Sequence, residues 1–168
     1  MGDVICKIAE TEAERQGHFA VRHTIFVEEQ QLFDRSDVDE HDAHAIPLIA
    51  LTETGEVVGA VRVYPDEADA TLWYGGRLAV LKTYRQHAGS IGANLCRLAE
   101  ATVIEQGCQR FLAYIQLPNV RFFERLGWHK VGEPVLYCGV LHQLVAASLA
   151  KANQSETVAL DVRQMIHA

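Results

Sequence analysis

The segment from Leu78 to Ala93 has the residues of a phosphate-binding site. A predicted strand ends at Val80, a loop rich in small residues follows, and a helix is expected to begin near Ser90. The first turn of a helix carries free backbone N–H groups and a positive dipole end, which together attract anions. Arg85 adds positive charge beside this loop. The segment therefore predicts a phosphate cradle, although a plain helix cap with a flexible loop fits the same composition.

This loop differs from the common glycine-rich nucleotide motifs. It lacks the Gly-Lys-Ser/Thr ending of a P-loop and the three glycines of a dinucleotide fingerprint. Ser90 has neighbours like those of a nucleophile elbow, but that elbow places its serine directly at a strand end, and Ser90 lies well beyond Val80. A nucleophilic serine is therefore not expected here.

Hydrophobic periodicity predicts the elements that position this loop. Strands are expected at 4–8, 46–51, 57–64, 72–80, 110–116, 135–137 and 141–147, and helices after residue 11, near residue 90 and from about residue 119. Thr11 and Glu14 have the spacing of a capping box. Gly75 and Gly76 lie side by side inside a strand, which predicts a bulge or a close backbone approach. Strands interleaved with helices predict an α/β fold with a mixed sheet flanked by helices.

The composition is that of one globular domain. A chain of 168 residues is too short for two full domains with a linker, so we expect residues 1–168 to form one domain with a C-terminal extension from about residue 150. No apolar run approaches the roughly 20 residues that span a bilayer. The N-terminus, Met1-Gly2-Asp3, carries acid where a signal peptide carries base. We therefore expect a cytoplasmic protein without a membrane partner.

Charge and cysteine spacing argue against a nucleic-acid-binding, disulfide-linked or metal-binding protein. The formal net charge is -7 and no cluster of Lys and Arg occurs, so nucleic acid is not an expected partner. The four cysteines include no Cys-x-x-Cys pair, which predicts reduced, mostly buried thiols. The acidic run from Asp34 to Asp42 lacks the glycine of a calcium loop. We therefore expect no metal, and we interpret the run as a solvated loop.

Two blocks of sequence resemble the GNAT superfamily of acyl-CoA-dependent N-acetyltransferases. The family's pyrophosphate motif, Q/R-x-x-G-x-G/A, is matched best by His87-Ala88-Gly89-Ser90-Ile91-Gly92, with histidine for the leading residue and serine for the first glycine. The segment Asn119-Val120-Arg121-Phe122-Phe123-Glu124-Arg125-Leu126-Gly127-Trp128 is similar to the N-x-x-x-x-F/Y-E-K-L-G-F block and is the more specific match. The likeness spans nearly the whole chain.

This resemblance implies a GNAT fold and an acyl-CoA substrate. The implied fold is a mixed, mostly antiparallel central sheet of six to seven strands flanked by helices and splayed between strands 4 and 5, after Val80 and Gln116. The pantetheine arm would pair with the fourth strand and the pyrophosphate with the start of the next helix. The residues implied to bind acetyl-CoA are Leu78, Ala79, Val80, Arg85, His87, Ala88, Gly89, Ser90, Ile91, Gly92, Ala93, Asn119, Phe122 and Phe123.

The first third resembles a subset of these enzymes. The segment 22–30 followed by 37–42 is similar to an R-x-x-V-F-V-x-E-Q then D-x-D-x-x-D pattern of small-molecule acyltransferases, of which a thinner version occurs in acyl-homoserine-lactone synthases. The segment 137–142 resembles an A-G-I-P-H stretch of the same subset, with Leu141 in place of proline. The resemblance implies a small-molecule acceptor, and the surplus acid from Glu28 to Asp42 is where we expect a cationic amine to arrive.

Acyl transfer to an amine needs a neutral amine and a protonated or stabilised leaving thiolate. In many relatives a tyrosine of the second block supplies that proton, but the matching residue here is Phe123. Another group must therefore act, or the thiolate leaves unaided. The candidate bases are Glu28, Glu29 and His142, and the candidate donors are Tyr74 and Tyr137. The same glutamates also fit a solvated helix end, and His142 also fits a structural strand histidine.

We therefore predict an N-acetyltransferase that moves an acetyl group from acetyl-CoA directly to a primary amine of a small molecule. Direct transfer is expected because no cysteine stands in a recognisable nucleophile setting. Two alternatives stay open, an N-acyl synthase that uses a longer acyl donor and a catalytically silent acyl-CoA-binding module. The apolar tail beyond Ala146 can pack across a second copy in a homodimer or fold back on its own chain.

Overall fold

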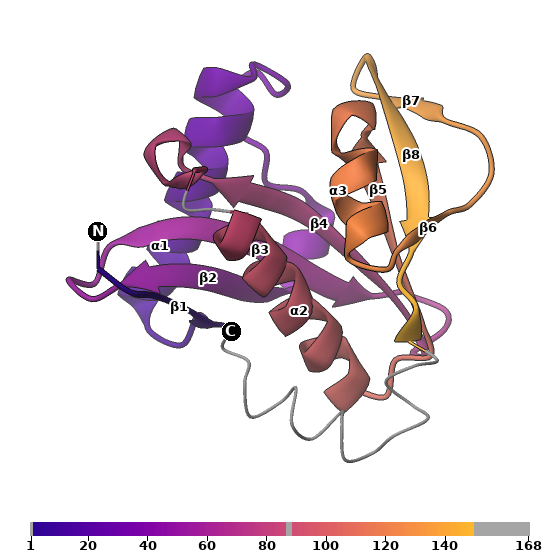
Figure 1. Ribbon diagram of the computed structural model, residues 1–168, viewed down its shortest axis with the longest axis horizontal. Helices are drawn as coiled ribbons and strands as arrows, with labels where there is room; N and C mark the ends of the chain where they lie inside the picture. Colours follow the sequence, from indigo (N-terminus) through magenta and orange to yellow (C-terminus); the bar gives the residue numbers. More distant parts are fainter. Residues whose placement is uncertain (1, 87–88, 150–168) are drawn as a thin grey trace.

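The computed structural model describes residues 2–86 and 89–149, with one twisted sheet at its centre (Figure 1). The proposed C-terminal extension, His87 and Ala88 lie outside the described residues. The strands are β1 (Val4–Ile8), β2 (Ile46–Thr52), β3 (Val57–Pro65), β4 (Leu72–Val80), β5 (Arg110–Gln116), β6 (His129–Lys130), β7 (Val135–Tyr137) and β8 (Val140–Ala146).

The strand order confirms the mixed, mostly antiparallel sheet. The order is β1-β2-β3-β4-β5-β8-β6, with β7 paired to β8. Only the β4–β5 pair is parallel among the described strands. The expected six to seven strands are corrected to eight, because the two-residue β6 is too short to give a periodic signal in the sequence.

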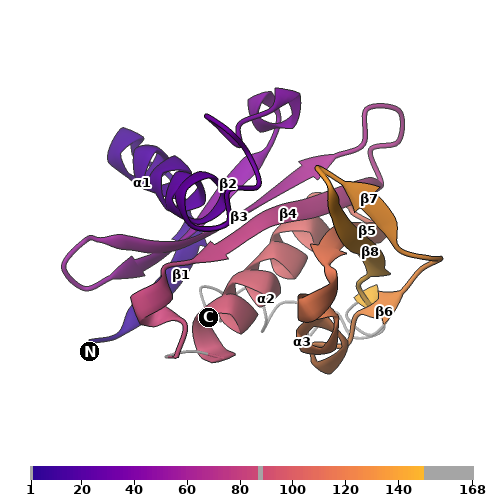
Figure 2. The same cartoon turned by 90° about the horizontal axis from the view of Figure 1, so that it is seen from above.

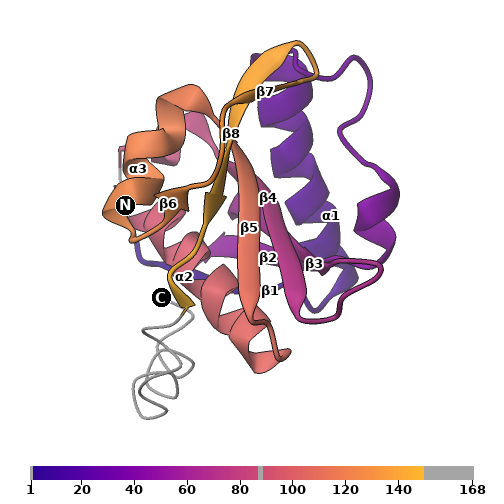
Figure 3. The ribbon, with the colours of Figure 1, turned by 90° about the vertical axis from the view of Figure 1, so that its right-hand side faces the viewer.

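Helices cover both faces of the sheet (Figure 2 and Figure 3). The helix α1 (Glu12–Arg22) lies on one face and continues into a π-helix, η1 (His23–Glu29). The helices α2 (Gly89–Glu105) and α3 (Val120–Arg125) lie on the other face. Short 3-10 turns are η2 (Glu40–Ala43), η3 (Lys82–Tyr84) and η4 (Leu117–Asn119). The capping box at Thr11 and Glu14 is confirmed.

Two apolar clusters hold these layers together. The larger cluster includes buried residues of α2 and of the sheet, among them Leu95, Val63 and Phe111. The smaller one joins α1 and η1 to the sheet through residues such as Ile25 and Ala79. Burial of such side chains stabilises the fold by about 25 cal/mol for each Å² removed from water.

The strands β4 and β5 part within their length and not at their ends. Their pairing stops at Gly75 and Ala113, so the expected splay after Val80 and Gln116 begins earlier than predicted. A bulge in β4 bends the strand at this point, because Arg77 and Leu78 together stand opposite the single Val61 of β3.

The two glycines of β4 have different surroundings. A Cβ on Gly75 would lie 2.9 Å from Cζ of Phe111, which confirms the close approach predicted for this pair. A Cβ on Gly76 would meet nothing within 4 Å. The bulge follows directly after them, at Arg77, whose φ of 54° is left-handed.

Candidate active site

A cavity of about 530 Å³ lies where β4 and β5 separate. Its walls come from both faces of the sheet, with η1 and η2 on one side and α2 and α3 on the other. Residues of β7 and β8 complete the wall beside β5. A cleft that is open between two strands exposes unpaired backbone groups, which can accept an extended ligand such as a chain of amides.

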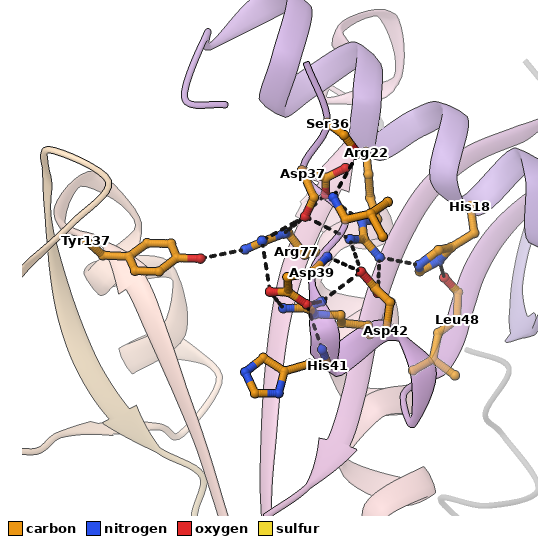
Figure 4. Close-up of polar contacts among 12 residues, drawn as sticks. His18, Arg22, Ser36, Asp37, Asp39, His41, Asp42, Leu48, Arg77 and Tyr137 are labelled. Atoms are coloured by element: carbon orange, nitrogen blue, oxygen red, sulfur yellow. Dashed lines mark hydrogen bonds and ion pairs between the residues drawn. The ribbon is translucent and has the colours of Figure 1, made fainter. Parts of the chain in front are cut away.

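A buried arginine lies behind the cavity wall beneath α1. Arg22 donates from Nε to Asp37 Oδ2 at 2.7 Å and from Nη1 to Asp42 Oδ1 at 2.7 Å. Its side chain is fully buried, and Asp37 is only 2% exposed. Figure 4 shows these groups converging from α1 and from the segment that follows η1. Buried charges are stable only when they are paired in this way.

Two further arginines extend this network toward the cavity. Arg62 of β3 contacts Asp39 at 2.6 and 2.9 Å and Asp42 at 3.1 Å. Arg77 of the β4 bulge donates to Asp37 at 3.1 Å and to Asp39 at 3.3 Å. With Arg22, three arginines and three aspartates share the network, so their formal charges cancel.

The interpretation of the acidic run as a solvated loop is therefore wrong for Asp37, Asp39 and Asp42. Arginines of α1, β3 and β4 draw these carboxylates inward, because an arginine buried without a carboxylate is far less stable. Asp34 and Glu40 of the same run are exposed. Because Asp37, Asp39 and Asp42 are paired with arginines, this run offers a cationic amine less attraction than expected.

The protonation of this network follows from burial and pairing. Burial alone would raise the pKa of Asp42, but hydrogen bonds from Arg22 and its charge outweigh burial and hold that pKa well below the usual range. Burial lowers the pKa of His18 to about 4. Neutral His18 donates from Nδ1 to the Leu48 carbonyl at 3.0 Å and accepts from Arg22 Nη1 at 3.2 Å. A neutral imidazole is the form that fits beside a guanidinium.

Aromatic rings line the cavity between β3, β4 and η2. His41 stacks on Tyr64 with 4.3 Å between ring centroids, and Tyr64 stacks on Tyr74 at 5.6 Å. The hydroxyl of Tyr74, a candidate proton donor, lies 3.5 Å from Asp66 Oδ1. Burial first and the Asp66 charge second raise the pKa of Tyr74. Tyr74 thus lines the cavity, with its proton held toward a carboxylate.

The opposite wall carries His142 and Tyr137. His142 is 5% exposed, and its Nδ1 donates to the Val140 carbonyl at 2.9 Å, so Nε2 keeps a free lone pair in the neutral ring. The two rings meet edge to face with centroids 5.2 Å apart. The Tyr137 hydroxyl accepts a hydrogen bond from Arg77 Nη1 at 3.4 Å, across the cavity from the aspartate network (Figure 4).

The structure does not bring Glu28 and Glu29 to this cavity. Both are exposed at the end of η1, and neither is among the residues that line it. Glu28 lies 3.9 Å from His23, and Glu29 lies 2.7 Å from Arg85. The two glutamates thus lie at a solvated helix end, which was the alternative to a catalytic role that the sequence left open.

The residues implied to bind acetyl-CoA have varied positions. Leu78, Asn119 and Phe123 line the cavity. Ala79 points its side chain into the cluster beneath α1. Arg85 donates from Nε to the Val80 carbonyl at 3.0 Å. In α2, Ile91 and Ala93 are buried, and a Cβ on Gly92 would lie 3.4 Å from Phe122. Gly89 and Ser90 begin α2, as the predicted helix start requires.

Two buried ionisable groups of α2 lie near the same cavity. Cys96 lines it, and burial raises the pKa of this thiol far above its usual range. Burial also raises the pKa of Glu100 to about 7, while Trp128 Nε1 donates to this carboxyl at 3.4 Å. A thiol that resists ionisation is a poor nucleophile.

Sequence reasoning did not identify Arg62 or Arg77 as site residues. Each lies within a strand whose other residues are mostly apolar, and a charged side chain inside such a run is a signal of internal pairing. Among residues 2–86 and 89–149, no group of three or more His, Cys, Asp or Glu could hold a metal ion. No described helix is long and apolar enough to cross a membrane.

Comparison with known proteins gives three findings. The family described as Acetyltransferase (GNAT) matches residues 9–128. A Bacillus subtilis (strain 168) protein named as an acetyltransferase is 30% identical over 129 residues, which are 76% of this chain and 84% of that protein. The crystal structure of a Lactobacillus plantarum protein named as an N-acetyltransferase has a TM-score of 0.76 at 20% identity, covering 87% of this chain and 98% of the other.

The fold is also similar to that of acyl-homoserine lactone synthases and of a further bacterial protein. The CoA-dependent acyl-homoserine lactone synthase BjaI has a TM-score of 0.68 at 21% identity, covering 95% of this chain and 89% of that chain. Escherichia coli ElaA gives a TM-score of 0.74 at 18% identity, covering 88% and 100%. Both N-acetyltransferases and lactone synthases thus share this arrangement of strands and helices.

Proposed function

Because this chain belongs to the GNAT acetyltransferase family, we propose that it moves an acetyl group from acetyl-CoA to a primary amine of a small molecule. The observation that carries the proposal is the cavity between β4 and β5, where strand pairing stops at Gly75 and Ala113. The free backbone edge beyond this point suits the amide-rich pantetheine arm. The reaction belongs in the cytoplasm, where acetyl-CoA and reduced thiols occur together.

The donor is proposed to lie along β4 and against the start of α2. Backbone groups of Leu78, Ala79 and Val80 would pair with pantetheine, and Asn119 and Phe123 would contact it from the other side of the opening. The pyrophosphate would lie at the N-terminus of α2, with positive charge nearby from Arg85. This arrangement lets a protein of net charge -7 bind an anion through backbone N–H groups.

His142 is the base that the geometry supports best. Its Nδ1 is committed to the Val140 carbonyl, which directs the free lone pair of Nε2 away from that bond, and the ring lines the cavity. A neutral imidazole can accept the proton that an amine loses as it attacks. Tyr74 also lines the cavity, but Asp66 lies beside its hydroxyl. Glu28 and Glu29 are too far out on the surface to share the cavity.

Transfer is proposed to be direct, from thioester to amine, without a covalent enzyme intermediate. Cys96 is the cysteine that lines the described cavity, and its raised pKa keeps it protonated. Holding both substrates in one cavity makes the attack effectively unimolecular, which accelerates such reactions strongly. The protein must therefore hold the two substrates in position and transfer protons, and it needs no nucleophile of its own.

A longer acyl donor is the second candidate. The part of the cavity beneath α2 is apolar, and Ala99, Phe111 and Trp128 line it. Each buried methylene of an acyl chain contributes about 0.8 kcal/mol. An acyl chain in this part of the cavity would strengthen donor binding, as in an N-acyl synthase.

The test is thiol release from acyl-CoA donors over a panel of amines. Wild-type protein, mixed with acetyl-CoA and separately with octanoyl-CoA, is assayed with spermidine, phenethylamine, glucosamine and lysine. Amine-dependent release with acetyl-CoA supports the proposal, and a tenfold preference for octanoyl-CoA favours the synthase. Binding of both donors without release over the whole panel would favour a silent acyl-CoA-binding module and overturn the proposal.

Calorimetry tests the donor site separately. Gly92→Asp introduces a carboxylate at the start of α2 and is expected to weaken acetyl-CoA binding at least tenfold. Asn94→Asp adds the same charge further along this helix, where the side chain still accepts from Arg97, and is the matched control. Equal affinities of the two variants for acetyl-CoA would contradict the proposal that the pyrophosphate binds at this helix end.

A further inference from the structure

We propose that Tyr137 donates the proton to the departing CoA thiolate and that Arg77 holds it in place. This inference rests on the proposed acyl transfer and names the proton donor of that same site. A proton donor is needed because Phe123 occupies the position at which many relatives have a tyrosine. Phe123 is buried, has no hydroxyl, and packs edge to face against Phe122 and Trp128.

The hydrogen bonding of Tyr137 leaves its proton available. Its hydroxyl oxygen accepts from Arg77 Nη1 at 3.4 Å, and an arginine has no acceptor atom. The phenolic hydrogen must therefore point elsewhere, and no described residue accepts it. Tyr137 lines the cavity and is 39% exposed, so this hydrogen is free to reach a ligand in the cavity.

Arg77 is fixed more firmly than a surface arginine. Its Nε donates to Asp37 Oδ2 at 3.1 Å and its Nη2 to the Asp37 carbonyl at 2.9 Å. Its guanidinium lies over the Phe33 ring, with Cζ 4.6 Å from the centroid. Arg77 lies at the β4 bulge and lines the cavity, and Figure 4 shows it between the aspartates and Tyr137. A guanidinium held beside a phenol stabilises the phenolate that proton donation leaves behind.

The other tyrosines of this wall are less suited to the task. The hydroxyl of Tyr74 lies 3.5 Å from the Asp66 carboxylate, which disfavours a phenolate. Tyr64 has the ring of His41 stacked on it at 4.3 Å and the guanidinium of Arg62 at 5.1 Å from its centroid. Of these three tyrosines, Tyr137 is the one whose hydroxyl oxygen accepts a hydrogen bond from an arginine while its hydroxyl hydrogen has no acceptor among the described residues.

The step balances with His142 as its partner. The amine nitrogen forms a bond to the thioester carbon, and His142 Nε2 takes the proton that the nitrogen loses. The C–S bond then breaks, and the thiolate takes the proton of Tyr137, which becomes a phenolate paired with Arg77. Transfer of a proton from the imidazolium to the phenolate, through solvent, restores both groups. The products are an amide and CoA thiol, and no oxidant, metal or further reactant is needed.

The experiment compares Tyr137→Phe with wild type, using the best amine of the panel and two acetyl donors. With acetyl-CoA, kcat is expected to fall about a hundredfold, within the range of general acid catalysis, and KM to stay within about twofold. With 4-nitrophenyl acetate, whose phenolate leaves without a proton, the rates of the two proteins should agree within about threefold. Cys138→Ser, at the neighbouring exposed position of the same hairpin, should match wild type with both donors.

Two results would overturn the role of Tyr137. One is an unchanged kcat with acetyl-CoA, and the other is an equal loss with both donors, which indicates a structural role for the ring. Thermal unfolding of the variant separates misfolding from chemistry. Failure of the proposed function itself is distinct, since wild-type protein would then release no thiol with any amine.

Discussion

The two walls of the cavity are built by different means. The wall beneath α1 is backed by a network of arginines and aspartates, in which Arg22 contacts two carboxylates and an imidazole. The wall from β7 and β8 is an apolar hairpin whose Leu136 is 72% exposed, and Arg77 donates to it at Tyr137. Most polar groups of this network are paired with one another, although the buried Nε of Arg62 has no partner, whereas the second wall presents groups that can form further hydrogen bonds.

This difference assigns separate tasks to the two walls. This network of paired charges fixes the position of the β4 bulge, and with it Arg77, because displacement would leave further charges unpaired. The groups that we propose as base and acid must exchange protons, and they lie on the other side, where His142 Nε2 has no protein partner and the Tyr137 hydroxyl hydrogen has no acceptor among the described residues. The following changes test the contrast, from the largest expected effect to the smallest.

Removing the central arginine should damage stability most. Arg22→Met leaves the carboxylates of Asp37 and Asp42 without their main partner, and the free energy of unfolding should fall by about 3–5 kcal/mol. Urea denaturation followed by fluorescence measures the change. Arg15→Met removes an exposed pair with Glu12 and should alter stability by less than about 1 kcal/mol. Similar losses for both variants would contradict a rigid wall.

Acid should weaken the α1 wall through His18. The pKa of this group is about 4 in the folded protein against 6.5 in the unfolded chain, so only the unfolded chain gains a proton as pH falls below 6.5. Between pH 7 and pH 5, the titration of His18 should thus lower the free energy of unfolding of the wild-type protein by about 2 kcal/mol. The stability difference between wild type and His18→Gln, measured by denaturation at the two pH values, should shrink by that amount. A constant difference would show that His18 titrates normally.

The opposite pH response is expected on the α2 side of the sheet. The pKa of Glu100 is about 7 when folded against 4.5 when unfolded, so the folded state binds the extra proton between these values. The contribution of Glu100 to the free energy of unfolding should therefore rise by about 2 kcal/mol as the pH falls from 7 to 5. Glu100→Gln should remove that rise, which denaturation at both pH values will show. Wild-type stability alone is a poor test, because His18 and Glu100 act in opposite directions.

The two adjacent glycines of β4 should differ in their tolerance of a methyl group. Gly75→Ala places its Cβ 2.9 Å from Phe111 and should cost about 1–3 kcal/mol of stability. Gly76→Ala meets no atom within 4 Å and should change stability by less than about 1 kcal/mol. Thermal unfolding of the pair gives the comparison. Equal effects would mean that the space beside Gly76 is not open.

The smallest effect is expected for an exposed hydrogen bond between β5 and the segment after η1. Gln116 Nε2 donates to Gln30 Oε1 at 2.9 Å, from β5 to the residue after η1. Because both groups are exposed, water can replace either, and Gln30→Ala should cost about 0.5 kcal/mol or less. A loss above about 2 kcal/mol in urea denaturation would show that the walls are coupled more tightly than their contacts indicate.

The sequence predicted much of the fold, because strands and helices leave periodic signals. The capping box at Thr11, seven of the strands and the close approach at Gly75 all follow from local patterns. The pairing of Asp37, Asp39 and Asp42 did not, since a run of acids reads as solvated until distant arginines are placed beside it. The early parting of β4 from β5 depends on a bulge, and which strand residue is left-handed is decided by tertiary contacts.

Family resemblance shaped the expectations for the site, and packing separated the candidates. Glu28, Glu29 and His142 were equal candidates in the sequence because each is a base in a matching segment. Only His142 lines the cavity, since η1 directs both glutamates to the surface. Arg77 had no motif to mark it, because its importance comes from contacts with residues remote in the chain.

The central claim is that acyl transfer occurs in the opening between β4 and β5. The most direct test is thiol release from acetyl-CoA over the amine panel by wild type and by Gly76→Leu, whose side chain would enter the cavity. The expected result is amine-dependent release by wild type and at least a tenfold lower kcat/KM for the variant at unchanged thermal stability. Release at the wild-type rate by Gly76→Leu would contradict the claim.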